Sequence, residues 1–283
     1  MRGAGHGKLI LCGEHAVVYG HPALAFAVTL STTVTLSPWA GATRVDSPHA
    51  DPRVRDALCT VLPEDGWRAQ VTTDVPVGRG MGSSAALAVA VVRALHPELE
   101  GQPLIDAAMP IEQAFHGNPS GLDVAVSALG GGLRFRKGPP MELAPVGLGA
   151  WHVVVLDSGT PGDTRALVAG VASRRPGVDP QLQRIGDLVD EAQGVLRDAA
   201  ALGALLDENH ALLREIGVST PRLDALVALA RDAGAHGAKL AGAGGGGVVL
   251  ALCSDPEPVL RAAAARGIPA LPARPAPRHG ALG

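Results

Sequence analysis

A glycine-rich segment at residues 76–84, PVGRGMGSS, leads directly into an apolar stretch typical of a buried helix. Three alternating glycines remove side chains where a backbone must approach a ligand or adopt a positive φ. The N–H groups and positive pole of the following helix suit a phosphate, and two serines add hydroxyls for phosphate or Mg²⁺. No lysine follows the glycines, so this is not a Walker loop. The alternative is an ordinary glycine turn with a serine helix cap.

Two carboxylates flank a second turn, at residues 117–121. Glu112 and His116 are four residues apart and share a face if one helix contains both, and Asp123 opens the next short helix. One carboxylate could hold Mg²⁺ while the other accepts a proton. The alternatives are solvated helix ends for the carboxylates and, for His116, a contact with the helix C-terminal dipole.

Two further segments contain unusual residues. Lys8 begins an apolar strand whose far end carries Glu14 and His15. Lys239 precedes the small-residue run at 241–247, which fits a backbone packed tightly against a ligand or against another backbone. Lysine is rare here, because the chain has 24 basic residues and only three are lysines, so each lysine is a candidate for a specific role. The third, Lys137, fits a solvated loop.

The composition excludes several classes of protein. With 283 residues the chain has room for one large or two small domains, and 47% hydrophobic residues supply a core. A net charge of −3 and 2% aromatic residues argue against nucleic-acid binding. Three scattered cysteines without a CxxC pair indicate neither disulfides nor a zinc site. No apolar run approaches the ~20 residues of a membrane span, and the first residues do not resemble a signal peptide. We therefore expect a cytoplasmic protein without a membrane partner.

The strands and helices that the sequence pattern predicts around these residues indicate an α+β protein. A boundary near residues 155–160 separates domains 1–157 and 158–283, with a cleft between two lobes. The second-half helices are rich in Val, Ala and Leu, so they fit either a homodimer face or core. Pro110 should kink or split its helix. The predicted strands are 8–11, 30–36, 70–73, 132–135, 152–157, 248–253 and 268–271; the predicted helices are 84–95, 104–115, 121–129, 163–174, 181–201, 205–216, 221–233 and 258–266; residues 272–283 should fray.

Taken together, the four segments resemble the GHMP kinase superfamily. PVGRGMGSSAA resembles its phosphate loop, and KLAGAGGGG resembles its C-terminal glycine motif. Within the superfamily, GKLILCGEHAVVYGHPALA, EQAFHGNPSGLDVAVSALGGGL and TRALVAGV are most similar to the mevalonate kinases. The resemblance implies a two-lobed fold, with a ribosomal-protein-S5-like N-terminal domain and a ferredoxin-like C-terminal domain. It also implies ATP-dependent phosphorylation of the 5-hydroxyl of mevalonate, giving 5-phosphomevalonate and ADP.

The resemblance also implies roles for individual residues. Asp123 matches the catalytic aspartate and Lys8 the lysine beside it, while Ser84 and Glu112 match the positions that hold Mg²⁺. Near Asp123, Lys8 would keep the carboxylate ionised and offset charge on the developing alkoxide. The ATP-binding residues implied are Pro76, Gly78, Gly80, Met81, Gly82, Ser83 and Ser84, and the substrate-side residues are Glu14, His15, Gly242, Ala243, Gly244 and Thr164.

Some residues depart from the family pattern. Ala241 stands where Thr or Ser is usual, and Gly162 stands where many mevalonate kinases have an arginine that could hold the substrate carboxylate. Arg165 or another cation could replace that arginine. Alternative acceptors therefore stay open: mevalonate at another position, phosphomevalonate, or a small sugar or amino alcohol. Phosphomevalonate is disfavoured because no Lys/Arg cluster lies beside Glu14 or Asp123. A non-catalytic nucleotide-binding regulator is the non-enzyme alternative.

Overall fold

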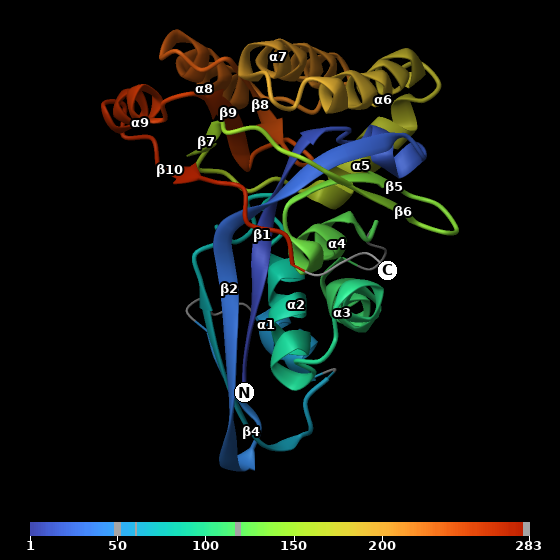
Figure 1. Ribbon diagram of the computed structural model, residues 1–283, viewed down its shortest axis with the longest axis vertical. Helices are drawn as coiled ribbons and strands as arrows, with labels where there is room; N and C mark the ends of the chain where they lie inside the picture. The colour runs from blue at the N-terminus through green and yellow to red at the C-terminus, as the bar shows by residue number, and fades with distance from the viewer. Residues whose placement is uncertain (48–51, 60, 117–119, 280–283) are drawn as a thin grey trace.

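A computed structural model describes the chain at residues 1–47, 52–59, 61–116 and 120–279 and places them in two lobes (Figure 1). Each lobe is a β-sheet with helices packed on it, as expected for an α+β protein. The first sheet follows the order β3-β4-β2-β5-β6, with β1 paired to β2. Its strands are β1 (Arg2–Cys12), β2 (Pro22–Ala42), β3 (Arg44–Asp46), β4 (Asp65–Thr73), β5 (Gly132–Arg136) and β6 (Glu142–Val146).

Close contact between β1 and helix α2 (Ser83–Leu95) organises the first lobe. A methyl group built on Gly3 would lie 2.2 Å from the carbonyl oxygen of Ala90, and one built on Gly5 would lie 2.1 Å from that of Ala86. Only glycine therefore lets the strand lie on the helix backbone here. Helix α2 is apolar all round, as a buried helix should be. This packing holds the start of α2 beside the middle of β1.

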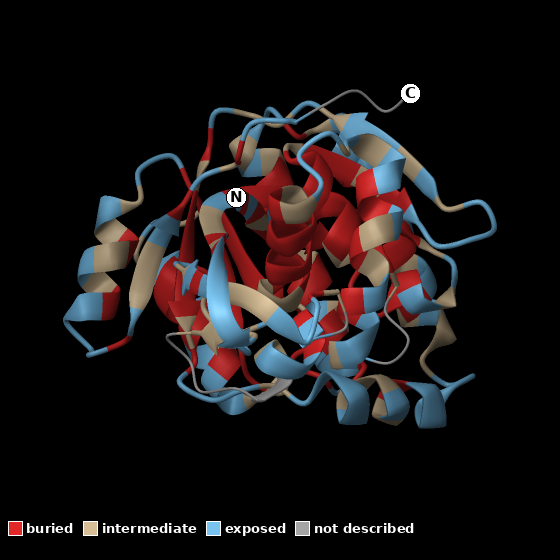
Figure 2. Cartoon of the chain, turned by 90° about the horizontal axis from the view of Figure 1, so that it is seen from below, coloured by how far each residue is buried: buried red, intermediate tan, exposed pale blue. Residues whose placement is uncertain are grey.

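Three more helices complete the first lobe. Helix α1 (Pro52–Cys59), helix α3 (Gly101–His116) and helix α4 (Leu122–Leu129) join α2 in one apolar core with the inner face of the sheet. Figure 1 shows α2, α3 and α4 on the same side of β1 and β2. The buried residues gather in the middle of the molecule and the exposed ones cover its outer helices (Figure 2).

The second lobe has a four-stranded antiparallel sheet in the order β10-β7-β9-β8. Its strands are β7 (His152–Asp157), β8 (Gly237–Ala241), β9 (Val248–Cys253) and β10 (Ala270–Ala273). Its helices are α5 (Thr164–Arg174), α6 (Asp179–Gly194), α7 (Ala199–Glu215), α8 (Pro221–Asp232) and α9 (Glu257–Ala264). A short helix, η1 (Ala16–Tyr19), lies between β1 and β2 in the chain. Helices α6, α7 and α8 lie across one end of the molecule in Figure 1, and their apolar side chains pack in the core.

Several element predictions are confirmed and several are wrong. Strands β7 and β9 begin and end where predicted, and α2 differs by one residue. Pro110 does not split α3, which continues to His116. The helix predicted over 181–201 is two helices, because the Asp198 side chain accepts from two N–H groups and caps α7. Strands β3, β6 and β8 and helices α1 and η1 were not predicted. Strand β7 belongs to the second sheet, so that sheet begins before the boundary predicted at 157/158.

The described part of the C-terminal segment, up to residue 279, is not frayed. Residues 274–279 return to the first lobe, where the N–H of Ala276 donates to the oxygen of Ala27 at 2.7 Å and the N–H of His279 donates to that of Leu129 at 2.7 Å. These bonds connect the C-terminal segment to the first lobe. The fraying prediction was wrong here because it relied on Pro- and Gly-rich composition, which says nothing about such backbone bonds. Residues 280–283 of the predicted fraying segment lie outside the described residues.

The second-half helices contribute many of their apolar side chains to the core. Among the described residues, the exposed large hydrophobic side chains are Met1, Val18, Trp39 and Val77, and none lies on α6, α7 or α8. Lys137 is exposed, as predicted, and all three cysteines are free. Within the described ranges, the helices are too short or too polar to cross a bilayer.

Candidate active site

The loop between β4 and α2 is built around three glycines. Its glycines Gly78, Gly80 and Gly82 have φ values of 71°, 80° and 70°, a region that favours glycine. Gly82 is the N-cap of α2 and no side chain bonds to the first turn. The serine-cap alternative is therefore wrong, since Ser83 and Ser84 are the first two residues of the helix itself. The N–H groups of this first turn, which no side chain caps, suit an anion.

Lys8 and Asp123 meet beside this loop. Nζ of Lys8 lies 3.1 Å from Oδ1 of Asp123, with the lysine side chain 5% exposed and the aspartate 32% exposed. The N–H of Lys8 donates to the oxygen of Met81 at 2.9 Å, and a methyl group built on Gly82 would lie 2.9 Å from Cγ of Lys8. The lysine stem thus packs against the glycine loop, and its ammonium points at a carboxylate that solvent can reach. The Met81 side chain is buried, so this residue takes part in the loop contact through its backbone oxygen.

Glu112 is a buried carboxylate with one unsatisfied oxygen. Oγ of Ser84 donates to its Oε1 at 3.1 Å and also lies 3.1 Å from Nε2 of His116, while Oε2 has no partner among the described residues. Burial, and then the charge of Asp123, raise the pKa of Glu112 to about 8, against the hydrogen bond from Ser84 and the charge of Lys8. A buried carboxylate next to another carboxylate, with a free oxygen and a hydroxyl beside it, is a donor set that suits a hard cation.

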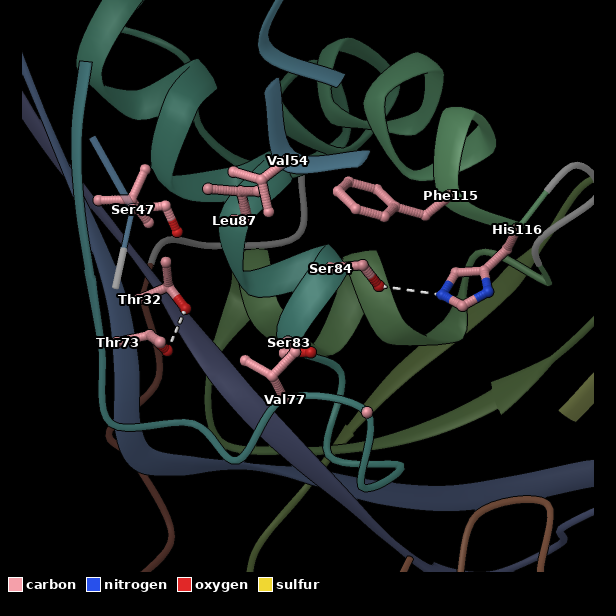
Figure 3. A pocket seen from close by; sticks show the side chains of 12 residues that line it. Thr32, Ser47, Val54, Thr73, Val77, Ser83, Ser84, Leu87, Phe115 and His116 are labelled. Carbon is pink, nitrogen blue, oxygen red and sulfur yellow. Dashed lines mark hydrogen bonds between the residues drawn. The ribbon is translucent and has the colours of Figure 1, made fainter. Parts of the chain in front are cut away.

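His116 contributes more than a helix-end charge. It is the last residue of α3, and its ring lies 3.6 Å from Oε1 of Glu112 as well as against Ser84 (Figure 3). Residues 117–119 of the following turn lie outside the described residues.

A cavity of about 120 Å³ opens next to Ser83 and Ser84 (Figure 3). Its walls are mostly apolar, and Thr32 and Thr73, whose hydroxyl oxygens are 2.8 Å apart, supply a polar edge. A flat apolar group with polar atoms on its rim fits such a site. The sequence analysis did not predict this cavity; the signal available was Thr73, just before the glycine loop, since Thr32 lies far away in the sequence on β2. The apolar walls include Val54, Val71, Val77, Leu87 and Phe115.

Glu14 and Lys239 form a fully buried ion pair. Nζ of Lys239 bonds to Oε1 of Glu14 and donates to the oxygen of Leu240 at 2.8 Å, and both side chains are at most 1% exposed. Lys239 is therefore occupied inside the protein, and Glu14 faces Lys239 instead of open space. The pair joins the end of β1 to β8, which holds the start of η1 against the second lobe.

His15 adopts a strained backbone conformation. It has φ 61° and ψ −47°, the one positive φ outside glycine among the described residues, and such strain usually persists where the surroundings require it. Its Nε2 lies 2.9 Å from the oxygen of Ala243, so this nitrogen carries the proton. Burial lowers the pKa of His15, which keeps the ring neutral near pH 7.

The glycine turn between β8 and β9 packs directly against the backbone of the glycine loop at residues 76–84. A methyl group built on Gly80 would lie 3.2 Å from the oxygen of Ala241, and one built on Gly247 would lie 3.0 Å from that of Arg79. Gly242 and Gly244 have φ values of 85° and 84°. The run therefore packs tightly against another backbone, which is one of the two expectations for it, and the same packing brings the turn to the edge of the phosphate loop.

Gly162 has no room for a side chain. A methyl group built there would lie 2.3 Å from the oxygen of Gly244. Thr164, two residues later, is exposed at the start of α5, whose N-cap Asp163 accepts from the N–H of Ala166 at 3.0 Å. The departure from arginine at 162 is thus built into the backbone packing of this chain.

Two family models match the chain. GHMP kinases N terminal domain covers residues 53–131, and GHMP kinases C terminal covers residues 187–268.

Curated relatives match most of the chain. Mevalonate kinase of Thermococcus onnurineus (strain NA1) is 35% identical in an alignment that covers 88% of this chain and 88% of its own. Mevalonate kinase of Pyrococcus abyssi (strain GE5 / Orsay) is 36% identical and covers 87% of this chain and 86% of its own.

Solved structures share the fold over nearly the whole length. L. major mevalonate kinase in complex with R-mevalonate has a TM-score of 0.85 at 26% identity, covering 97% of this chain and 96% of its own. Methanococcus jannaschii mevalonate kinase has a TM-score of 0.85 at 22% identity, covering 97% and 98%, and supports the fold alone.

Proposed function

The chain belongs to the GHMP kinase family, and from that premise we propose that it transfers the γ-phosphoryl group of ATP to the 5-hydroxyl of mevalonate, giving 5-phosphomevalonate and ADP. The observation that carries the proposal is the ion pair of Lys8 with Asp123 beside the glycine loop. The curated mevalonate kinases at 35–36% identity and the related structure with bound R-mevalonate support mevalonate as the acceptor.

ATP would lie along the start of α2. The triphosphate suits the glycine loop, from Pro76 to Gly82, and the first turn of α2, because a helix N-terminus attracts an anion. The base suits the apolar cavity, with the hydroxyls of Thr32 and Thr73 at its rim.

Ser84 and Glu112 are the residues that would hold Mg²⁺. The unpaired Oε2 of Glu112 and its raised pKa fit a carboxylate whose partner is a cation. A hydroxyl, a carboxylate and phosphate oxygens form a donor set that Mg²⁺ prefers. When bound, the ion would neutralise charge on the phosphate oxygens.

Asp123 would act as the general base. As the 5-oxygen attacks the γ-phosphorus, an O–P bond forms, the bond to the β-phosphate oxygen breaks, ADP leaves, and the hydroxyl proton passes to the Asp123 carboxylate. Lys8 would hold Asp123 in place through the 3.1 Å contact and stabilise negative charge on the attacking oxygen. Phosphoryl transfer depends chiefly on this positioning and charge neutralisation.

The acceptor would lie between the start of η1, the glycine turn and the start of α5. His15 is neutral there and binds the Ala243 carbonyl, so it can orient a hydroxyl but cannot supply a positive charge. Gly242, Gly244 and Thr164 would border the same space, while Glu14 would act through its bond to Lys239. The acceptor is a small soluble molecule; neither nucleic acid nor a membrane is needed, which fits a cytoplasmic enzyme.

A coupled assay of ADP formation tests the proposal. Purified protein with ATP and Mg²⁺ would be given R-mevalonate, phosphomevalonate, galactose or homoserine in turn. We expect rapid ADP formation with R-mevalonate and at most slow formation with the others. Faster turnover of another alcohol would assign that acceptor instead, and tight ATP binding without turnover of any alcohol would favour a nucleotide-binding regulator.

A further inference from the structure

The phosphate loop carries an arginine whose partner lies in the other lobe. Nε of Arg79 is 3.0 Å from Oδ2 of Asp157, the last residue of β7, and the two side chains are 22% and 23% exposed. The loop belongs to the first lobe and β7 to the second sheet. This ion pair therefore crosses between the lobes at the point where nucleotide is expected.

The loop needs external support because its sequence is intrinsically flexible. Three glycines with positive φ within five residues lose much conformational entropy when they are ordered. The bond from the Lys8 N–H to Met81 fixes the end of the loop at α2. Arg79, in the middle of the loop, is held by Asp157.

Asp157 is itself held by its surroundings. Its Oδ1 accepts from the N–H of Gly159 at 2.8 Å, so its other oxygen is free to face Arg79. The N–H of Ser158 donates to the oxygen of Gly247 at 2.9 Å, and Gly247 packs on the Arg79 backbone. The loop, the end of β7 and the glycine turn thus meet at the Arg79–Asp157 pair.

We propose that the Arg79–Asp157 ion pair is a positioning device that holds the phosphate loop in its nucleotide-binding shape. The inference rests on the proposed function only in that the loop binds ATP. A loop ordered in advance binds its ligand more tightly, because the ordering cost is removed from the binding step. Arg79 acts through Asp157, so removing either charge has the same effect.

The test is calorimetric titration of ATP with Mg²⁺ into the full chain without an acceptor. Arg79→Gln and Asp157→Asn each remove one charge, and the asparagine keeps an oxygen for the Gly159 N–H. A partly exposed ion pair is worth up to about 1 kcal/mol, so we expect each variant to raise the Kd for ATP about fivefold. The double variant should bind no more weakly than either single variant, since both remove one interaction.

Arg134→Gln is the matched control. Arg134 of β5 also pairs with the other lobe, at 2.8 Å from Asp190 of α6, but it does not touch the phosphate loop. We expect its Kd for ATP to equal that of wild type. Circular dichroism melts would confirm that all variants are folded.

Four results would overturn the inference: unchanged ATP binding in Arg79→Gln, an effect of Arg79→Gln without one of Asp157→Asn, additive effects in the double variant, or an equal loss in Arg134→Gln. The second result would mean that Arg79 contacts the nucleotide directly. If the wild-type protein bound no ATP, the proposed kinase function would fail first. The titration contains no acceptor, so its result does not depend on which alcohol the protein phosphorylates. Loss of ATP binding in wild type would therefore count against the kinase function, whereas wild-type binding with unaffected variants would count against the positioning role alone.

Discussion

Replacing Glu112 by glutamine should stabilise the nucleotide-free protein at high pH and not at low pH. Glu112 is 2% exposed, and its pKa rises from 4.5 to about 8 through burial first and the Asp123 charge second. Between these two pH values the folded protein keeps a proton that the unfolded chain releases. Stability therefore falls as pH rises through this window, and the loss is complete above pH 8. Glutamine is neutral throughout and can still accept from Ser84.

The size of the effect follows from the same two values. At roughly 1.4 kcal/mol per pH unit, the gap between 4.5 and about 8 corresponds to at most about 5 kcal/mol in the free energy of unfolding. Relaxation and water entry reduce such values, so we expect a gain of a few kcal/mol for Glu112→Gln at pH 8 and about zero at pH 4.5. In a chain of this size, ~1 kcal/mol shifts Tm by roughly 2–4 °C or less.

The assay is denaturant unfolding of wild type and Glu112→Gln from pH 4.5 to 8.5 with EDTA present. Glu142→Gln is the control, because Glu142 is exposed on β6. Its curve should follow the wild-type curve at every pH. Added Mg²⁺ should stabilise wild type at pH 8 more than Glu112→Gln. A difference between Glu112→Gln and wild type that did not grow with pH would refute the reasoning on this buried carboxylate.

The remaining predictions concern the catalytic pair and two glycines. Asp123→Asn should reduce kcat by about 10²–10⁴-fold while calorimetry finds ATP binding nearly unchanged, and wild-type turnover would exclude Asp123 as the base. Lys8→Gln should lower kcat by about 10²-fold or more in the same assay, and a change in KM alone would contradict its role in charge stabilisation. Gly82→Ala combines a φ of 70° with a methyl group 2.9 Å from Cγ of Lys8, so Tm and ATP affinity should both fall; an unchanged affinity would mean that this contact does not shape the site. Gly162→Ala places a methyl group 2.3 Å from a carbonyl oxygen and should cost about 1–3 kcal/mol in unfolding experiments, whereas Gly194→Ala, with open space around it, should not.

Local sequence pattern predicted those elements whose signal is continuous. The buried helix α2 and the strands β7 and β9 are unbroken apolar runs with clear ends, and they were predicted to within one residue. The break between α6 and α7 was missed because apolar spacing continues through it, although Asp198 before an alanine run was the available capping signal. Strand β8 was missed because its five residues adjoin the glycine run and carry no alternation.

The site was predictable where resemblance linked distant segments. The spacing of Lys8 and Asp123 in the sequence does not indicate that they lie together. The prediction that they do came from the resemblance to the motif order of a known family, and in the structure their charged atoms are 3.1 Å apart. The fully buried pairing of Glu14 with Lys239 was not predicted, because it depends on β1 lying beside β8. The contact of Arg79 with Asp157 likewise depends on how the two lobes pack.

The most direct test of the central claim is the identity of the phosphorylated product. The protein would be incubated with ATP, Mg²⁺ and R-mevalonate, and the product examined by two-dimensional ³¹P–¹H NMR. Transfer to the 5-hydroxyl predicts a phosphomonoester phosphorus coupled to the two C5 methylene protons, together with one ADP per phosphate transferred, and loss of both signals in Asp123→Asn. A phosphomonoester signal without such coupling, as expected for the tertiary 3-hydroxyl, or the absence of any phosphorylated mevalonate, would contradict it.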